Sequence, residues 1–203
     1  VIEVADALEL DRFAVLGISG GGPYAAACAF KIPDRLSAAA IVSGMGPTEA
    51  PGTKDGLSWT YAGKSSLIRR LLLMLTSMGL RKQPEKFISQ MEEGLKGPDK
   101  VLAQDKPELV KGTVDTFSEA LRSGIAGAHH EARLYTRPWG FRLQDIPIEV
   151  HLWHGEQDYN VPISVGRYVA DAIPNCHAKF IENEGHLSLI NKYVREYLNV
   201  LVS

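Results

Sequence analysis

Two short apolar runs, separated by a glycine cluster and a helix of small residues, most constrain the fold of this sequence. The run Arg12 to Ile18 suits a buried strand, and Pro23 to Phe30, which follows three consecutive glycines, favours a helix. Leu36 to Val42 is typical of the next buried strand. A strand, a helix and a second strand in this order indicate a parallel sheet covered by helices. We therefore expect an α/β fold, with a helix within residues 1–10 preceding the first strand.

The same alternation returns near the C-terminal end, after a long segment with no convincing strand. Residues 45–137 carry successive amphipathic helical patterns, so we expect a helical insertion there, with the sheet domain formed by 1–44 and 138–203. The helices expected in the insertion are Ser65–Leu80, Glu85–Leu95, Asp99–Gln104, Glu108–Arg122 and Ile125–Thr136. After the insertion we expect strands at Ile148–Trp153 and Ala178–Ile181, and helices at Val165–Ile173 and Leu187–Leu201.

Composition is that of a soluble globular protein and argues against several classes of function. A chain of 203 residues with 45% hydrophobic residues can build a core without disulfides or metals. Lys and Arg total 22 and Asp and Glu total 24, with the charges interspersed, so we expect no nucleic-acid partner. The longest apolar run, Leu71 to Leu75, is too short to span a membrane. The two cysteines form no framework and no secretion signal is visible, so we expect a cytoplasmic protein.

The most specific local pattern is Gly17-Ile18-Ser19-Gly20-Gly21, which matches G-x-S-x-G between an expected strand and an expected helix. A sharp strand-to-helix turn strains the backbone at the serine, and side chains two positions to either side would collide. We therefore expect Gly17 and Gly21 to be required for their small size. Such a turn exposes the Ser19 hydroxyl at the C-terminal edge of the strand. It also aims the Gly20 N–H at the place where an oxyanion would form.

The same pentapeptide has a second interpretation, a glycine-rich turn that packs closely or holds a phosphate. Its glycines do not fall into the G-x-G-x-x-G register, and no Lys-Ser or Lys-Thr pair follows as in a P-loop. A serine hydroxyl is a poor nucleophile unless a base takes its proton and a carboxylate orients that base. Downstream residues therefore decide between the two interpretations.

Candidates for the base and the carboxylate both follow expected strands. Asp158 lies in the loop after the strand Ile148–Trp153, and His186 lies in the loop between the last expected strand and the last helix. Both positions fit partners of Ser19 at the C-terminal ends of parallel strands. Glu156 is a competing acid, but its position nearer the strand end favours a solvated loop charge. We predict Asp158 as the acid.

These three motifs, in the order Ser, Asp, His, resemble the α/β-hydrolase family over essentially the whole chain. The resemblance implies an α/β-hydrolase core with a mostly parallel sheet and covering helices, and an all-helical cap at 45–137. It implies that Ser19 attacks a carbonyl carbon, that His186 takes and returns the proton, and that Asp158 holds the imidazole. By the same resemblance Gly20 supplies one oxyanion-hole N–H, and no cofactor or metal is needed. The expected substrate contacts are Val161, Leu187 and Trp139.

Several residues allow a structural as well as a functional interpretation. Trp139 either lines the site or packs at the hinge between cap and core. His151 and His154 should point to opposite faces of one strand, which argues against a metal pair. His129 and His130 diverge on an expected cap helix, so one packs and one is solvated unless either faces the substrate.

The family also implies strands that precede the nucleophile strand, and a loop after the third strand that supplies the second oxyanion-hole N–H. We therefore expect this chain to lack the N-terminal strands, which leaves the strand within residues 12–18 as an exposed apolar edge. A second copy, a separate N-terminal fragment or the missing strands would pair with it. The apolar segment Ser65–Leu80 either covers an apolar pocket or touches lipid, and both interpretations imply a small-molecule substrate with an apolar part.

The function that these residues favour is a serine hydrolase that acts on a small ester, amide or activated carbonyl through an acyl-enzyme. Serine at the elbow argues against dehalogenases and epoxide hydrolases, which resemble this chain but use a carboxylate nucleophile. Carbon–carbon bond cleavage, perhydrolase and aminopeptidase activities stay open. Two alternatives from other classes also stay open: a binding or signalling protein with slow or no turnover on this fold, and an inactive truncated fragment.

Overall fold

The computed structural model describes residues 1–56 and 66–202. The chain divides into two compact units, the first formed by residues 1–56 and 139–203 and the second by residues 57–138. The first unit thus keeps residues 45–56, which sequence patterns assign to the insertion. Those residues include the short helix α3 (Thr53–Gly56), which no sequence pattern predicted. The buried Thr53 hydroxyl donates a hydrogen bond to the carbonyl of Pro47, which holds α3 against the preceding loop.

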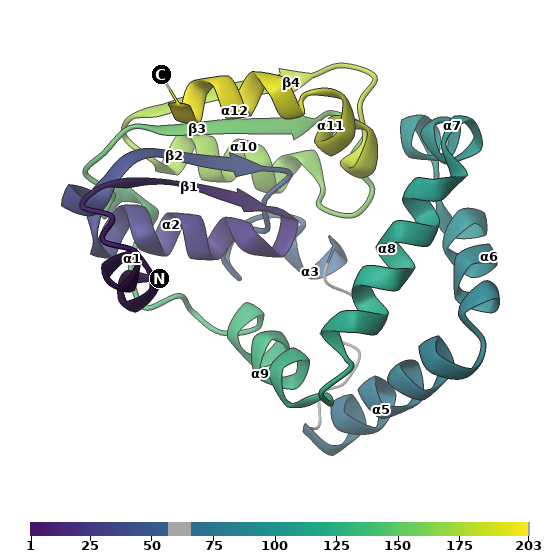
Figure 1. Cartoon of the computed structure of the whole chain (residues 1–203). Coiled ribbons are helices and arrows are strands. Elements are labelled where there is room, and N and C mark those ends of the chain that lie inside the picture. The colour runs from purple at the N-terminus through teal and green to yellow at the C-terminus, as the bar shows by residue number, and fades with distance from the viewer. Residues whose placement is uncertain (57–65, 203) are drawn as a thin grey trace. The chain divides into compact units, whose positions relative to one another are not determined.

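One parallel sheet organises the first unit (Figure 1). Its order is β1-β2-β3-β4, and neighbouring strands pair in parallel throughout. The strands are β1 (Phe13–Ile18), β2 (Leu36–Val42), β3 (Val150–Gly155) and β4 (Cys176–Ile181). All four lie where apolar runs predicted them, and the parallel α/β fold is confirmed. Among the described strands, β1 forms one edge of the sheet.

Helices cover both faces of this sheet (Figure 1). On one face α2 (Gly22–Lys31) packs on β1 and β2, and α10 (Ile163–Ala172) packs on β3 and β4. On the other face α11 (His186–Lys192) lies against β3, and α12 (Val194–Val202) lies against β1 and β2. A short helix, α1 (Ile2–Ala7), precedes β1, and an ion pair of 2.7 Å between Asp6 and Arg35 ties its end to the turn before β2.

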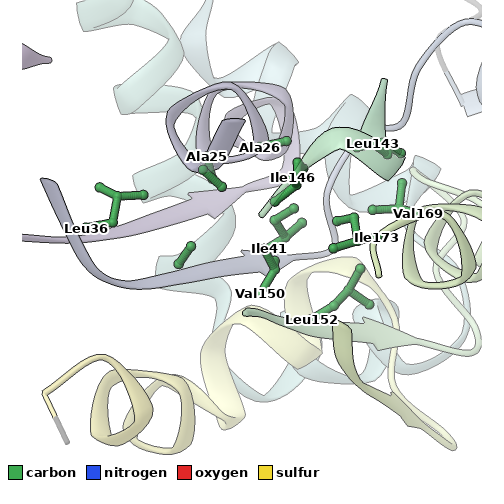
Figure 2. Packing of buried hydrophobic residues seen from close by; sticks show 12 residues of the cluster. Ala25, Ala26, Leu36, Ile41, Leu143, Ile146, Val150, Leu152, Val169 and Ile173 are labelled. Atoms are coloured by element: carbon green, nitrogen blue, oxygen red, sulfur yellow. The ribbon is translucent and has the colours of Figure 1, made fainter. Parts of the chain in front are cut away.

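Small side chains let α2 approach the sheet closely. Ala25, Ala26 and Ala29 of α2 are buried, and Ala25 and Ala26 face the sheet beside Ile41 of β2 (Figure 2). Leucines, isoleucines and valines from β2, β3, α10 and the segment before β3 complete this cluster. Burial of such aliphatic side chains contributes about 1.5–3 kcal/mol each, so this face forms the main core of the unit.

The last predicted helix is instead two helices, because α11 ends at Lys192 and α12 begins at Val194. No glycine or proline marks the break. Tyr197 is almost fully buried, and its hydroxyl donates to the carbonyl of Ile190, an acceptor that a continuous helix would use for its own backbone ladder. A tertiary hydrogen bond therefore accompanies a break that local sequence preference does not reveal.

Helices form the described part of the second unit. They are α5 (Ser66–Lys82), α6 (Pro84–Gly94), α7 (Gly97–Asp105), α8 (Pro107–Ala120) and α9 (Ala126–Tyr135). These correspond to the five helices expected there, although Ser65, the predicted start of the first, lies outside the described residues. Leu80, Val114 and Leu121 form the buried centre of the unit. In α5 most apolar side chains are exposed, among them Leu71 and Leu75. No helix in residues 1–56 and 66–202 has the length and hydropathy to cross a bilayer.

Candidate active site

The candidate nucleophile Ser19 occupies a strained turn between β1 and α2. Its φ is 52°, in the left-handed region that a residue with a side chain rarely adopts, and a single turn of 3-10 helix (Ser19–Gly21) leads into α2. Gly17 allows this turn, because a Cβ at that position would lie 2.4 Å from the carbonyl oxygen of Gly21 and 2.7 Å from Cβ of Ala25. The requirement for a small residue at position 17 is thereby explained sterically.

The matching expectation for Gly21 is wrong. A Cβ at Gly21 would meet nothing within 4 Å, and its φ of −75° suits any residue. The close approach occurs one residue later, where a Cβ on Gly22 would lie 2.9 Å from Cα of Gly44. The loop after β2 therefore contacts the start of α2 at Gly22. The steric constraint on the C-terminal side of the serine thus belongs to the contact between the start of α2 and the loop after β2, which the pentapeptide does not encode.

Backbone hydrogen bonds fix this turn to the neighbouring strands. The amide of Met45 donates to the carbonyl of Ser19 at 3.0 Å, and the amide of Ser43 donates to the carbonyl of Trp153, within β3, at 2.9 Å. The loop after β2 thus bridges the C-terminal ends of β1 and β3. It connects the serine turn with β3, the strand that precedes the loop of the candidate acid.

The candidate acid Asp158 lies in the loop between β3 and α10, with its side chain fully buried. Its Oδ1 accepts hydrogen bonds from the amides of Asn160 at 2.8 Å and Val161 at 2.7 Å. Two backbone donors on one oxygen stabilise a buried carboxylate and fix its direction. The other oxygen, Oδ2, is therefore directed to a different partner.

That partner is His186, the first residue of α11, whose Nδ1 lies 2.8 Å from Oδ2 of Asp158. A carboxylate only accepts, so Nδ1 carries the hydrogen and Nε2 is left as the acceptor nitrogen of the neutral ring. Two loops must meet for this contact. Gly155 permits the meeting, because a Cβ there would lie 2.4 Å from the carbonyl oxygen of Glu184. The amide of Gln157 also donates to that carbonyl at 2.9 Å.

The loop before His186 is itself anchored. The amide of Gly185 donates to Oγ of Ser188 at 2.7 Å, which caps the start of α11. Lys192 at the end of α11 forms an ion pair of 2.9 Å with the buried carboxylate of Glu184. The position of the imidazole is therefore set by helix capping and by an ion pair, in addition to its bond with Asp158.

The other predicted residues lie in different surroundings. Glu156, the competing acid, is partly exposed and pairs with Arg167 at 3.3 Å. Val161 is buried in the acid loop, and Leu187 is half-buried directly after His186. Trp139 packs against Phe141, which in turn stacks on Phe30 in the last turn of α2. Ser19 precedes the first turn of that helix, so the surroundings of Trp139 favour the hinge-packing interpretation.

A residue that sequence reasoning did not assign to the site is His154 on β3. It is fully buried, and its Nε2 donates to the carbonyl of Val161 at 2.9 Å and lies 3.7 Å from Oδ2 of Asp158. Burial lowers the pKa of His154, although the nearby charge of Asp158 opposes that shift. The sequence does show that His154 lies just before the acid loop. Only the register of β3 reveals that its side chain is directed at that loop.

The remaining histidines lie elsewhere. On β3 His151 accompanies Glu149, whose carboxylate also contacts His177 of β4. In the second unit His129 bonds with the Ser66 hydroxyl at 3.1 Å. Within residues 1–56 and 66–202 no three His, Cys, Asp or Glu side chains are grouped so as to hold a metal ion.

Comparison with solved structures identifies the fold. A thermophilic esterase from Thermogutta terrifontis matches 98% of this chain over 70% of its own length, with 19% identity and a TM-score of 0.67. The esterase RhEst1 from Rhodococcus sp. ECU1013 matches 98% over 69%, with 19% identity and a TM-score of 0.65. The α/β hydrolase MGS-M2 from a deep-sea metagenome matches 99% over 67%, with 18% identity and a TM-score of 0.60.

The sequence matches no family model and no curated protein. The similarity is thus one of fold, and the class it defines is the α/β-hydrolase fold. This chain corresponds to about 70% of the length of the esterase that it matches.

Proposed function

We propose that this protein is a serine hydrolase that cleaves a small ester, amide or activated carbonyl compound through an acyl-enzyme. The observation that carries the proposal is the 2.8 Å bond between His186 and the buried Asp158, at the C-terminal end of the sheet, where Ser19 follows β1 in a strained turn. A buried carboxylate, an oriented imidazole and a serine on a strained turn are the parts that activate a hydroxyl nucleophile. The likeness in fold to two esterases is consistent with this chemistry.

The proposed reaction assigns one role to each side chain. Ser19 Oγ attacks the substrate carbonyl carbon while Nε2 of His186 takes the hydroxyl proton. The resulting imidazolium is stabilised by Asp158 through the hydrogen bond at Nδ1. His186 then gives the proton to the leaving group, and a Ser19 ester remains. Water, activated by the same imidazole, hydrolyses that ester and restores the enzyme.

The negative oxygen of the tetrahedral intermediate needs hydrogen-bond donors. Gly20, which follows Ser19 in the single turn leading into α2, is the proposed source of one backbone N–H. Removing one such donor in characterised hydrolases costs about 10²–10³ in rate, so a single donor supports slower turnover than two. The second donor is not assigned among the residues described.

The exposed apolar side chains of the second unit are the reason to propose a substrate with an apolar part. Its helix α5 exposes leucines, isoleucine and methionines along much of its length, including Leu67, Leu71 and Leu75. An apolar surface of this extent normally meets a ligand, a partner or another part of the same protein. Acyl esters of increasing chain length therefore form the most informative substrate series.

Labelling with a fluorophosphonate tests the proposal directly. We expect covalent reaction at Ser19 in the wild-type protein, detected by mass spectrometry of the labelled peptide, and no reaction in Ser19→Ala. His186→Ala should also abolish labelling while leaving the far-ultraviolet circular dichroism spectrum unchanged. A folded wild-type protein that takes up no label would exclude an activated serine. Such a protein would be a non-catalytic binding or signalling protein, or an inactive fragment, on the hydrolase fold.

A further inference from the structure

His154 is the one fully buried histidine among the described residues, and its surroundings fix its ring. Its Nε2 has a carbonyl partner, Val161 O, at 2.9 Å, so this nitrogen carries the hydrogen. Its Nδ1 is buried without a hydrogen-bond partner. Gly166 of α10 packs against that side of the ring, because a Cβ there would lie 2.5 Å from Nδ1. The ring therefore has one tautomer and one orientation.

The partner of His154 belongs to the turn that directs the candidate acid. Val161 accepts from His154 through its carbonyl and donates through its amide to Oδ1 of Asp158 at 2.7 Å. Val161 is thus held through its carbonyl by His154 and through its amide by the carboxylate of Asp158, at the start of the same turn. A shift of this turn would rotate the carboxylate away from His186, whose Nδ1 depends on Oδ2.

A second contact reaches the carboxylate itself. Nε2 of His154 lies 3.7 Å from Oδ2 of Asp158, the same oxygen that accepts from His186. The ionisable side chains that face this network are Asp158 and His186, and beyond them lie Glu184, in the loop that precedes His186, and Lys192 at the end of α11, which form an ion pair. A positive charge on His154 would compete with His186 for Asp158. Desolvation of the buried ring disfavours that charge.

We propose that His154 is a positioning residue, which stays neutral and holds the turn 158–161 so that Asp158 remains directed at His186. The inference rests on the proposed function for its kinetic consequence. Its structural content, a neutral Nε2–H tautomer bonded to Val161, is independent of turnover. Loss of the Nε2–H donor should weaken the bond between Asp158 and His186 without removing either residue.

The kinetic experiment compares three replacements of His154 with wild-type protein, using a p-nitrophenyl ester. His154→Leu, which has similar volume but no donor, should lower kcat about 10- to 100-fold with little change in KM. The acidic limb of its kcat/KM profile should move to lower pH, because the His186 imidazolium loses stabilisation by Asp158. His154→Gln places an amide N–H near the position of Nε2 and should restore most of the rate. His154→Ala serves if the leucine variant does not fold.

A control on the same strand separates positioning from general disturbance. His151→Phe replaces a half-buried histidine outside this network and should leave both kcat and the acidic limb unchanged. The proposal is overturned if a folded His154→Leu or His154→Ala variant keeps an unshifted limb and a kcat within twofold of wild type. It is equally overturned if His154→Gln is as impaired as His154→Leu.

Nuclear magnetic resonance of ¹⁵N-histidine-labelled protein tests the same inference without substrate. In wild type the His154 ring should give the signature of a neutral Nε2–H tautomer, and a downfield proton resonance should mark the bond from His186 Nδ1 to Asp158. That resonance, assigned by its loss in His186→Ala, should broaden or move upfield in His154→Leu. A charged or Nδ1–H His154 ring in wild type would contradict the inference. Failure of Ser19 labelling with these spectra intact would instead remove only the proposed function.

Discussion

Nδ1 of His186 lies 2.8 Å from Oδ2 of Asp158, and both side chains are almost completely shielded from solvent. In such surroundings a charged hydrogen bond is stronger and more directional than at the surface. The bond selects the tautomer with its acceptor nitrogen away from the carboxylate. The base in the proposed reaction is thus set before any substrate arrives.

Asp158→Asn should lower the rate of ester hydrolysis by about 10³- to 10⁴-fold, because an amide can donate to Nδ1 and so favours the wrong tautomer of His186. The fold should persist, since asparagine has nearly the same shape. Initial rates with a p-nitrophenyl ester measure the effect. Glu156→Gln is the matched control, because Glu156 is partly exposed and paired with Arg167. Full activity in Asp158→Asn, with loss in Glu156→Gln, would transfer the role of acid to Glu156.

Gly17→Ala and Gly21→Ala should behave very differently, although both glycines belong to the same pentapeptide. A Cβ at Gly17 would meet backbone 2.4 Å away, so we expect a loss of about 1–3 kcal/mol in the free energy of unfolding and loss of Ser19 labelling. A Cβ at Gly21 meets nothing within 4 Å, and we expect a change within about 0.5 kcal/mol. Urea unfolding provides both values. Equal effects of the two substitutions would refute this steric account.

The stability of the first unit should depend on pH through Glu196. Its carboxylate accepts hydrogen bonds from Lys179 at 2.5 Å and from Trp153 at 3.0 Å. These bonds lower the pKa of Glu196 below its usual value, and the bond from Lys179 has the larger effect. A carboxyl with a depressed native pKa stabilises the fold above its unfolded pKa and loses that contribution as pH falls through its native pKa. Glu196→Gln should therefore lower the urea midpoint at pH 7, and its difference from wild type should be smaller at pH 3. An identical difference at both values would rule out this linkage.

The open edge at β1 should cause self-association. Its backbone groups on the side away from β2 have no strand partner among the described residues, and the strand is largely apolar. Analytical ultracentrifugation across a hundredfold range of concentration should show a rising average mass. An added peptide that supplies a neighbouring strand should suppress that rise. A single monomeric species at every concentration would show that the edge is protected in another way.

Much of the first unit was predictable because its elements follow local preference. Leu36–Val42 is both an apolar run and β2, and the helix of small residues after Ser19 is α2, because an apolar run suits a strand covered on both faces and small side chains suit a helix packed closely on the sheet. The bond between Asp158 and His186 was predictable in kind, since both follow strands that end at one sheet edge.

What the sequence did not reveal depends on contacts between distant segments. The break at Tyr193 accompanies the bond from Tyr197 to Ile190, and the steric need for glycine at position 22 depends on the path of the loop that contains Gly44. The position of His154 was visible, but its role depends on the register of β3 and on the turn that ends at Val161. Local patterns carry no information about these relationships.

The first unit is discontinuous, since residues 139–203 return to a sheet that residues 1–56 began. On the ribosome, β2 is therefore made long before β3, its neighbour through the pairing of Ala40 with His151, has been translated. While the helical segment is being translated, the edge of β2 that later pairs with β3 stays unpaired. An exposed apolar strand of this kind can associate with other nascent chains, which favours misassembly. Chaperone demand during expression should consequently fall if the two parts of the first unit are joined by a short linker in place of residues 57–138.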